Sequence, residues 1–209
     1  MPRVVSAEMG EPIYFAHFIC PSMSGRIPPG QFETKAFPVL QSGRVIDSLN
    51  ENNYSLEIGG EVLHPQKLSF AELGKWPHSE VSVDIHCVTT WSKLDTKWRG
   101  VLFTDVCRMV EPTPRAKFVI MECEEGHTTS LPLREMVKEN VMVADSYDGK
   151  PIEAKHGGPV RVLVPHKYFY KSAKWVRRLR FVEKDEPGYW EVRGYSNSAD
   201  PFAEERYTF

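Results

Sequence analysis

The feature that most constrains the fold is a series of short segments, from Tyr54 to Val182, in which apolar and polar residues alternate. Alternation over a few residues is typical of strands with one buried face. Paired glycines commonly mark turns, so residues 54–62 are expected to form a strand, a turn at Gly59-Gly60 and a second strand. Further strands are expected at residues 81–87, 117–123, 141–144, 160–164 and 175–182.

Short helices are expected between these strands. Residues 69–72, Ser-Phe-Ala-Glu, form a capping box that predicts a helix ending near Trp76. Residues 104–110 predict a second helix, which stops before Pro112, and residues 132–140 a third with proline in its first turn. Because the helices are few and follow no regular βαβ rhythm, we expect an α+β fold with mixed β-sheets.

The chain is expected to have three parts. Prolines and glycines interrupt any periodicity in residues 1–50, but interspersed aromatic residues favour an arm that packs on the domain over a disordered tail. Residues 51–184 form the domain itself, and 41% hydrophobic residues in a chain of 209 suffice for a full core. Residues 185–209 form an aromatic tail expected to dock on the body or on another subunit, and no chemistry is assigned to it.

Charge and cysteine usage exclude several classes. The net charge of −2 leaves no extended nucleic-acid surface. No apolar run approaches the roughly 20 residues of a membrane span, and the first residues lack the apolar segment of an export signal. We therefore expect a cytoplasmic protein that neither spans a membrane nor binds nucleic acid. The cysteines are widely spaced reduced thiols and include no Cys-x-x-Cys pair: Cys20, Cys87, Cys107 and Cys123.

Cys87 is the first candidate for chemistry. It lies where an expected strand enters a polar, aromatic loop, and a thiolate there can be a nucleophile or a soft metal ligand. The alternative is an ordinary buried cysteine, because free cysteines are usually buried. His86 points to the opposite face of the strand, so we expect it to be structural.

A second candidate is a basic cradle. Gly157-Gly158 allows a close backbone approach, Arg161 and Lys174 can neutralise a phosphate, and Ser172 adds a donor. The alternative is a hairpin turn followed by a solvated basic strand. The spacing of a P-loop is absent.

Cys123 and His127 border a turn at Gly126. Two ligands do not close a zinc site, so a structural loop beside a site is the better interpretation. A thiol-dependent or zinc-binding protein using Cys87, Cys123 and His127 remains an alternative.

Taken in order, these motifs resemble the molybdopterin domain of sulfite-oxidase-like oxidoreductases, in its short single-domain prokaryotic branch. The resemblance covers roughly residues 27–182. The residues that carry it are His86 to Ser92, Trp98 to Val101, Asp148 to Pro151, His156 to Pro165 and Lys171 to Trp175.

The resemblance implies roles for particular residues. Cys87 matches the cysteine that ligates molybdenum, and His156 with Arg161 matches the pair that holds the pterin and its phosphate. Ser172, Ala173 and Lys174 match the segment beside the phosphate. Contacts to the cofactor are also implied for Val39, Leu40, Gln41 and Cys123.

The activity implied is a two-electron oxygen-atom transfer on a small sulfur- or nitrogen-oxide substrate, with a separate electron-transfer partner. Arg99 and His127 are candidates for a substrate anion pocket. Two alternatives stay open, namely a sulfoxide-reductase-type subunit and a molybdopterin-binding carrier without catalysis.

Overall fold

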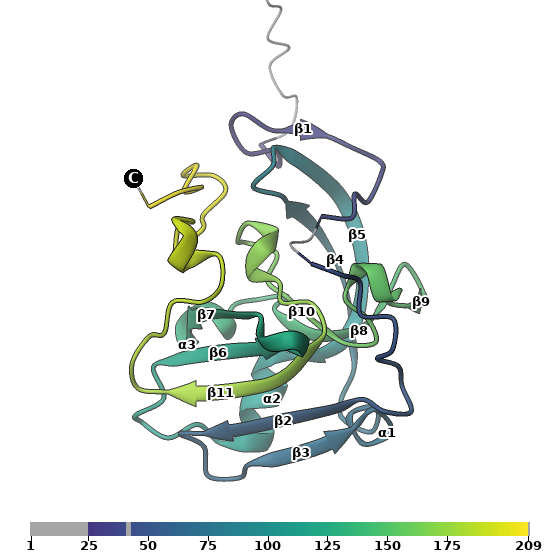
Figure 1. The fold of residues 1–209 in the computed structure, drawn as a ribbon, viewed down its shortest axis with the longest axis vertical. Helices are drawn as coiled ribbons and strands as arrows, with labels where there is room; N and C mark the ends of the chain where they lie inside the picture. Colours follow the sequence, from purple (N-terminus) through teal and green to yellow (C-terminus); the bar gives the residue numbers. More distant parts are fainter. Residues whose placement is uncertain (1–24, 41–42, 209) are drawn as a thin grey trace, which may run out of the picture.

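The computed structural model, which describes residues 25–40 and 43–208, is built around two β-sheets (Figure 1). We call them sheet A and sheet B. Sheet A contains β1 (Phe32–Glu33), β4 (Ser79–His86), β5 (Trp91–Leu102), β8 (Met142–Tyr147), β9 (Lys150–Pro151) and β10 (Arg161–Leu163). Its long strand β5 pairs with β1, β4 and β8, so it is the strand that joins the sheet together.

Sheet B has the strand order β3-β2-β11-β6-β7. Its strands are β2 (Ser55–Gly60), β3 (Gln66–Ser69), β6 (Phe118–Cys123), β7 (Thr128–Pro132) and β11 (Val176–Val182). The pair of β2 and β11 is parallel and the other pairs are antiparallel. The fold is therefore a mixed-sheet α+β fold, as the sequence predicts.

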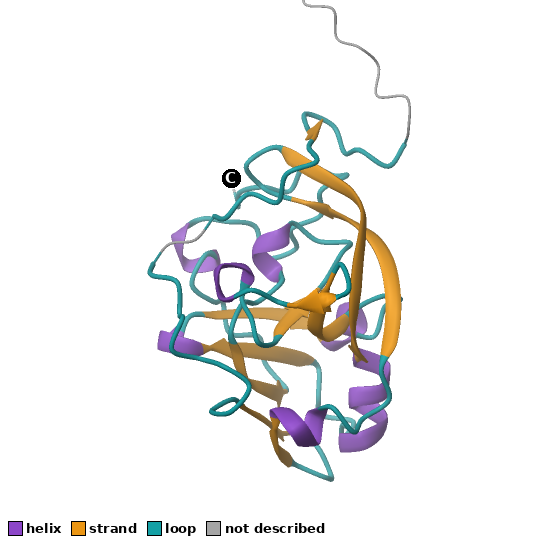
Figure 2. Ribbon diagram, turned by 90° about the vertical axis from the view of Figure 1, so that its right-hand side faces the viewer, coloured by secondary structure: helices purple, strands orange, loops and turns teal. Residues whose placement is uncertain are grey.

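The helices are short and lie between and beside the sheets (Figure 2). The α-helices are α1 (Phe70–Leu73), α2 (Phe103–Val110) and α3 (Leu133–Met136). Single 3₁₀ turns are η1 (Glu124–Gly126), η2 (Ala154–His156), η3 (Phe169–Lys171) and η4 (Glu191–Arg193). Three of these turns, η1, η2 and η3, carry or adjoin residues that the sequence analysis selected.

The larger core lies between the two sheets and α2. Leu56 and Ile58 of β2 are fully buried while Glu57 between them is half-buried and faces Arg178, which is the alternation that predicted the strand. Helix α2 adds Phe103 and Val106 to the same core. A second cluster surrounds Trp98 and Trp91 in sheet A and borders the candidate site described below.

Local signals predicted several elements correctly. The capping box is present: Ser69 accepts from the Glu72 amide, and the Glu72 carboxylate accepts from the Ser69 amide. Helix α2 begins one residue before its predicted start and ends at Val110. Helix α3 is much shorter than expected, because the chain leaves helical geometry at Val137.

The predicted turn at Gly59-Gly60 is wrong. Both glycines belong to β2, and a hairpin does not form there. Gly60 has a φ of +89°, and a Cβ atom at this position would overlap the backbone of Phe181 in β11. The glycine therefore permits a close approach between neighbouring strands rather than a chain reversal.

The described part of the N-terminal arm contacts sheet A. Strand β1 pairs with the start of β5, and Phe37 packs against Trp91, Trp98 and Tyr147. Predictions for residues 1–24, Cys20 included, and for Gln41 lie outside the described residues. Within the described ranges, no helix is long and apolar enough to cross a membrane.

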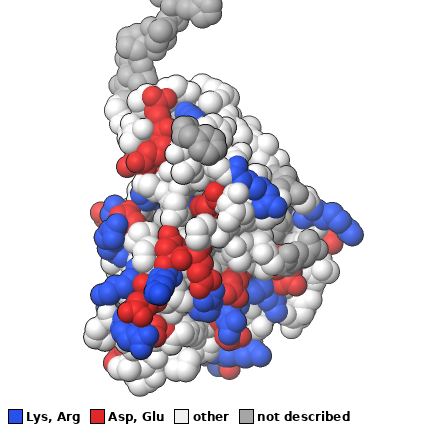
Figure 3. Space-filling view, turned by 60° about the vertical axis from the view of Figure 1, so that its left-hand side comes forward, with Lys and Arg blue, Asp and Glu red and all other residues white. Residues whose placement is uncertain are grey.

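Arginines of β11 are paired with acids, so this strand is not a simple basic face. Arg178 binds Glu57 at 2.6 Å, and Arg180 binds Glu122 at 2.9 Å and Glu186 at 2.5 Å. Basic and acidic side chains are interspersed in the surface view of Figure 3. Exposed ion pairs of this kind contribute little to stability. They also leave no extended surface of positive electrostatic potential along β11.

Candidate functional site

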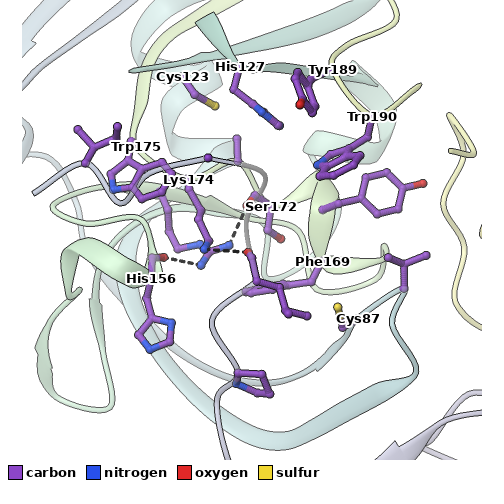
Figure 4. Close-up of a pocket in the computed structure, with 18 of the residues that line it drawn as sticks. Cys87, Cys123, His127, His156, Phe169, Ser172, Lys174, Trp175, Tyr189 and Trp190 are labelled. Carbon is purple, nitrogen blue, oxygen red and sulfur yellow. Dashed lines mark hydrogen bonds between the residues drawn. The ribbon is translucent and has the colours of Figure 1, made fainter. Parts of the chain in front are cut away.

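A cavity of about 620 Å³ brings together residues from distant parts of the chain (Figure 4). Its volume lies in the usual range for a cofactor site. Its walls come from the N-terminal arm, the turn after β4, the β6–β7 connection, the segment from η2 to β11 and the C-terminal tail. The sequence-selected residues that line it are Leu40, Cys87, Cys123, His127, His156, Arg161, Ser172, Ala173 and Lys174.

Cys87 lies immediately after β4, on a tight turn that leads into β5. Its carbonyl accepts from the Thr90 amide at 3.0 Å, and its Sγ atom lies 3.1 Å from Thr89 Oγ1. Cys87 is 8% exposed, and its thiol faces the cavity. Burial raises the pKa of Cys87, although the hydrogen bonds with Thr89 and then the charges of Arg206 and Lys174 oppose that effect. A bound metal ion would remove the thiol proton.

His86 is turned away from the cavity, as expected from strand geometry. Its Nδ1 atom lies 2.9 Å from Ser92 Oγ, and its ring meets Phe202 edge to face. Burial lowers the pKa of His86 to about 4, so the ring is neutral near neutral pH. These contacts agree with a structural role.

Arg161 is a buried cation with neutral partners. Its guanidinium donates to the carbonyls of His156 at 2.6 Å and Ser172 at 2.7 Å and lies over the ring of Phe169. Its Nε atom is buried and finds no partner among the described residues. Burial lowers the pKa of Arg161 to about 9. A buried charge without a counter-charge is costly, so this end of the cavity suits an anion.

Lys174 supplies a second cation at the same end. Its Nζ atom donates to the carbonyls of Leu40 at 3.2 Å and Lys155 at 3.1 Å, and no carboxylate of the described residues pairs with it. Burial, with the nearby charge of Arg161, lowers the pKa of Lys174 to about 7. A bound anion would favour the protonated form.

Backbone donors add to this basic end. The amides of Ala173 and Lys174 donate to no described residue. The Ser172 hydroxyl accepts from the Val164 amide at 3.0 Å, which leaves its own proton available. Gly157 has a φ of +97°, and a Cβ there would overlap the Lys174 side chain, so glycine lets the two segments approach. Free amides beside two cations form an anion-binding concavity.

His156 stacks on Phe37, with ring centroids 4.0 Å apart and an angle of 12° between the planes. Burial, then the charges of Arg161 and Lys174, lower the pKa of His156 to about 4, so the ring is neutral. A neutral imidazole can both donate and accept a hydrogen bond. The sequence analysis missed Phe37; its position in the proline-rich arm carried no periodic signal.

An aromatic wall formed by Tyr189, Trp190 and Tyr195 lies on the side of the cavity near His127. The His127 ring stacks on Tyr189 at 4.4 Å, and Trp190 contacts both tyrosines. The sequence analysis assigned no chemistry to this tail, and that assignment missed part of the site. The dense aromatic residues of the tail were the available signal.

Cys123 also lines the cavity, at the end of β6. It is 7% exposed, and burial raises its pKa to about 12. In Figure 4, Cys123 and His127 lie on the opposite side of the cavity from Cys87. No group of three His, Cys, Asp or Glu side chains in the described ranges is arranged to hold a metal ion, which weighs against the zinc alternative.

Some predicted residues lie elsewhere. Val39 is exposed and does not line the cavity, whereas Leu40 beside it does. Arg99 is also outside the lining and donates to Asp145 at 3.3 Å. The expectation that Arg99 contributes to an anion pocket is therefore wrong, because β5 directs it toward β8.

Comparisons with known proteins agree on one family. The family model described as "oxidoreductase molybdopterin binding domain" matches residues 42–190. The chain is 40% identical to the uncharacterized oxidoreductase YuiH of Bacillus subtilis, over 94% of this chain and 100% of the relative. It is 30% identical to the putative protein-methionine-sulfoxide reductase subunit YedZ1 of Azospira oryzae, over 84% of this chain and 68% of the relative.

Among solved structures, the sulfane dehydrogenase SoxCD of Paracoccus pantotrophus has a similar fold. The TM-score is 0.59 and the sequence identity 22%, over 65% of this chain and 40% of that chain. At this identity the likeness concerns the fold alone.

Proposed function

Because this chain belongs to the oxidoreductase molybdopterin-binding family, we propose that it binds a molybdenum–molybdopterin cofactor and catalyses oxygen-atom transfer on a sulfoxide-type substrate. The observation that carries the proposal is a single cavity with the Cys87 thiol on one side and two cations without acid partners on another. Family membership supports oxidoreductase chemistry, and the choice of substrate rests on the aromatic wall.

The residues present fit this cofactor. Arg161, Lys174 and the amides of Ala173 and Lys174 would hold the terminal phosphate, with the Ser172 hydroxyl as a further donor. The stacked, neutral ring of His156 would hydrogen-bond the pterin. Cys87 would ligate the metal as a thiolate. Leu40 and Cys123 would contact the organic part, whereas Val39 is exposed and outside the lining. The contact expected for Gln41, which lies outside the described residues, stays a prediction.

When bound, the cofactor supplies a two-electron oxygen-atom transfer in which a sulfoxide, two electrons and two protons give a thioether and water. The protein itself binds and orients. Arg161 and Lys174 fix the anionic end, the Cys87 turn sets the position of the metal ligand, and the aromatic wall excludes water beside it. Burial lowers the pKa of His127, which lies beside that wall and would be a hydrogen-bonding group for the substrate oxygen.

The substrate assignment follows from the charge of the walls. Tyr189, Trp190 and Tyr195 are aromatic side chains that offer flat apolar surfaces, which suit an organic sulfoxide. An inorganic anion such as sulfite would need a cation of its own, and Arg161 and Lys174 are assigned to the phosphate. The relative YedZ1 is named as a protein-methionine-sulfoxide reductase subunit, which agrees with this choice.

Sulfite oxidation is the second candidate, favoured by Arg44, an exposed basic residue on the cavity lining. Either reaction needs electrons to enter or leave, so a separate electron-transfer partner is part of the proposal. A cytoplasmic location stays a prediction.

Metal and cofactor analysis of full-length protein, made in a host that produces the cofactor, tests the proposal. We expect stoichiometric molybdenum and pterin, with turnover of an organic sulfoxide by a reduced dye and little sulfite oxidation with a dye acceptor. Sulfite turnover without sulfoxide turnover would favour the second candidate. Bound cofactor with neither activity would favour a carrier, and absence of molybdenum would refute the cofactor assignment.

A further inference from the structure

The turn that carries Cys87 is held by side chains from both ends of the chain. Gln31 Nε2 donates to the Cys87 carbonyl at 3.3 Å, and Arg206 Nη1 donates to the Val88 carbonyl at 2.6 Å. These contacts join residues 56 and 118 positions apart in the sequence. Neither side chain lines the cavity, so any effect on the reaction would act through the turn, whose residues Cys87, Val88 and Thr89 do line it.

The turn needs this support because its own bonds are few. The Cys87 amide donates to the Trp91 carbonyl at 2.8 Å, and the Thr90 amide donates to the Cys87 carbonyl at 3.0 Å. Thr90 has a φ of +79°, a conformation that β-branched residues rarely adopt. The Val88 carbonyl has Arg206 as its partner, and the Thr90 carbonyl has the Phe32 amide at 3.0 Å.

Arg206 is itself held in place. Its guanidinium lies over the ring of Tyr168, which is fully buried, at 5.0 Å. The N-terminal arm reaches the same point: a Cβ added at Gly30 would lie 3.7 Å from Arg206 Nη2 and 3.2 Å from Glu204 Oε1. Gly30 has a φ of +66°, so glycine there permits the close meeting of arm and tail.

Gln31 belongs to a second chain of bonds on the other side of the turn. Its Oε1 atom accepts from the Ser92 hydroxyl at 2.6 Å, and Ser92 Oγ lies 2.9 Å from His86 Nδ1. The last residue of β4 and the second of β5 are thereby tied to the side chain that binds the Cys87 carbonyl.

We propose that Arg206, with Gln31, is a positioning residue that fixes the orientation of the Cys87 thiol toward the cofactor. The inference rests on the proposed function because it takes Cys87 as the metal ligand. A hydrogen bond from a charged donor is stronger than one from a neutral donor, so we expect Arg206 to stabilise the turn more than Gln31 does. Arg206 of the C-terminal tail thus acts on the metal ligand without itself lining the cavity.

The test uses full-length, molybdenum-loaded protein and the variants Arg206→Gln, Arg206→Lys and Arg193→Gln. Arg193 is a matched control, since it also donates to a carbonyl, that of Tyr189 at 2.7 Å, but lies away from the Cys87 turn. The readouts are the electron paramagnetic resonance spectrum of the partly reduced protein and the hydrogen-exchange rate of the Thr90 amide.

We expect Arg206→Gln to shift or broaden the resonance and to speed Thr90 exchange about tenfold, a change that loss of one charge-assisted bond can produce. Arg206→Lys keeps one charged donor, so its resonance spectrum and its Thr90 exchange rate should be close to those of the wild type. Arg193→Gln should match the wild type in both readouts. If Arg206→Gln leaves the resonance unchanged, the proposal is overturned. This holds even if hydrogen exchange becomes faster throughout the protein, because a general loss of stability does not show that Arg206 positions the thiol.

Gln31→Ala gives a second route if Arg206→Gln does not fold. The same two readouts apply, with a smaller expected change because a neutral bond at 3.3 Å is lost. If the wild type carries no molybdenum, the proposed function fails, and Thr90 exchange in cofactor-free protein still decides whether Arg206 fixes the turn.

Discussion

The ammonium group of Lys171 and the carboxylate of Glu191 form an ion pair in the protein interior. Lys171 also donates to the carbonyl of Ser130 and to Asn197 Oδ1, each at 3.0 Å, and Thr129 donates to Glu191 at 2.8 Å. The pair ties η3, which precedes the phosphate-side residues, to η4, which lies between Trp190 and Tyr195 of the aromatic wall. One buried contact therefore connects two parts of the cavity wall.

Lys171→Met should destabilise the protein by about 3–5 kcal/mol, because Glu191 is left as an unpaired buried charge. The double variant Lys171→Met with Glu191→Leu should recover much of this loss. Urea unfolding followed by circular dichroism measures both. Lys138→Met is the control: it breaks an exposed pair with Glu135 and should cost less than about 1 kcal/mol. Equal effects at the two sites would contradict the prediction.

Cys87→Ser should remove molybdenum and turnover while the fold remains, because a serine hydroxyl can keep the contact with Thr89. Metal content, activity and the melting curve are the measurements. Cys107→Ser is the matched control, since Cys107 lies on α2 outside the cavity. Persistent turnover in Cys87→Ser would rule out the assigned role.

Arg161→Met should lower the amount of cofactor retained after dialysis by at least about tenfold, since a charge-assisted bond to phosphate contributes more than 1 kcal/mol. Arg161→Lys keeps the positive charge but cannot bind the phosphate through two parallel hydrogen bonds, so this variant should retain an intermediate amount of cofactor. Arg178→Met, on the outer face of β11, should retain as much as the wild type. Full retention in Arg161→Met would place the phosphate elsewhere.

Acid should destabilise the protein through His86. Its pKa falls from 6.5 to about 4 on folding, so between these values the unfolded chain binds a proton that the folded protein does not. The free energy of unfolding therefore decreases as the pH is lowered through this window. From about pH 7 to about pH 5, the wild type should lose roughly 2 kcal/mol more than His86→Gln. Identical losses in urea unfolding would show that His86 is not responsible.

Trp190→Ala should raise the KM for an organic sulfoxide about tenfold while cofactor content stays the same, because it removes aromatic surface from the wall only. Steady-state kinetics and molybdenum content give the two values. Val192→Ala is the control, as Val192 is exposed on η4 and outside the cavity. A loss of cofactor in Trp190→Ala would mean that the wall belongs to the cofactor site.

The order of the motifs along the chain, rather than any single motif, made the family recognisable from the sequence. Cys87 lies 74 positions before Arg161, and Arg161 lies 13 positions before Lys174. No short-range sequence pattern therefore links Cys87 with the two basic residues. The elements carrying them were predictable because side-chain periodicity and helix capping act over a few residues. The wrongly predicted turn at Gly59-Gly60 shows the limit of such local signals, because the glycine at position 60 is required by the close approach of the neighbouring strand β11.

The sequence by itself determined the α+β class, most strands, helix α2 and the thiol and cations from which the site is built. Only the tertiary structure decided that Phe37 stacks on His156, that Trp190 lines the cavity and that Arg206 holds the Cys87 turn. The physical reason is range: periodicity and capping are settled between near neighbours, whereas these contacts join distant segments that meet only when both sheets and both chain ends pack together.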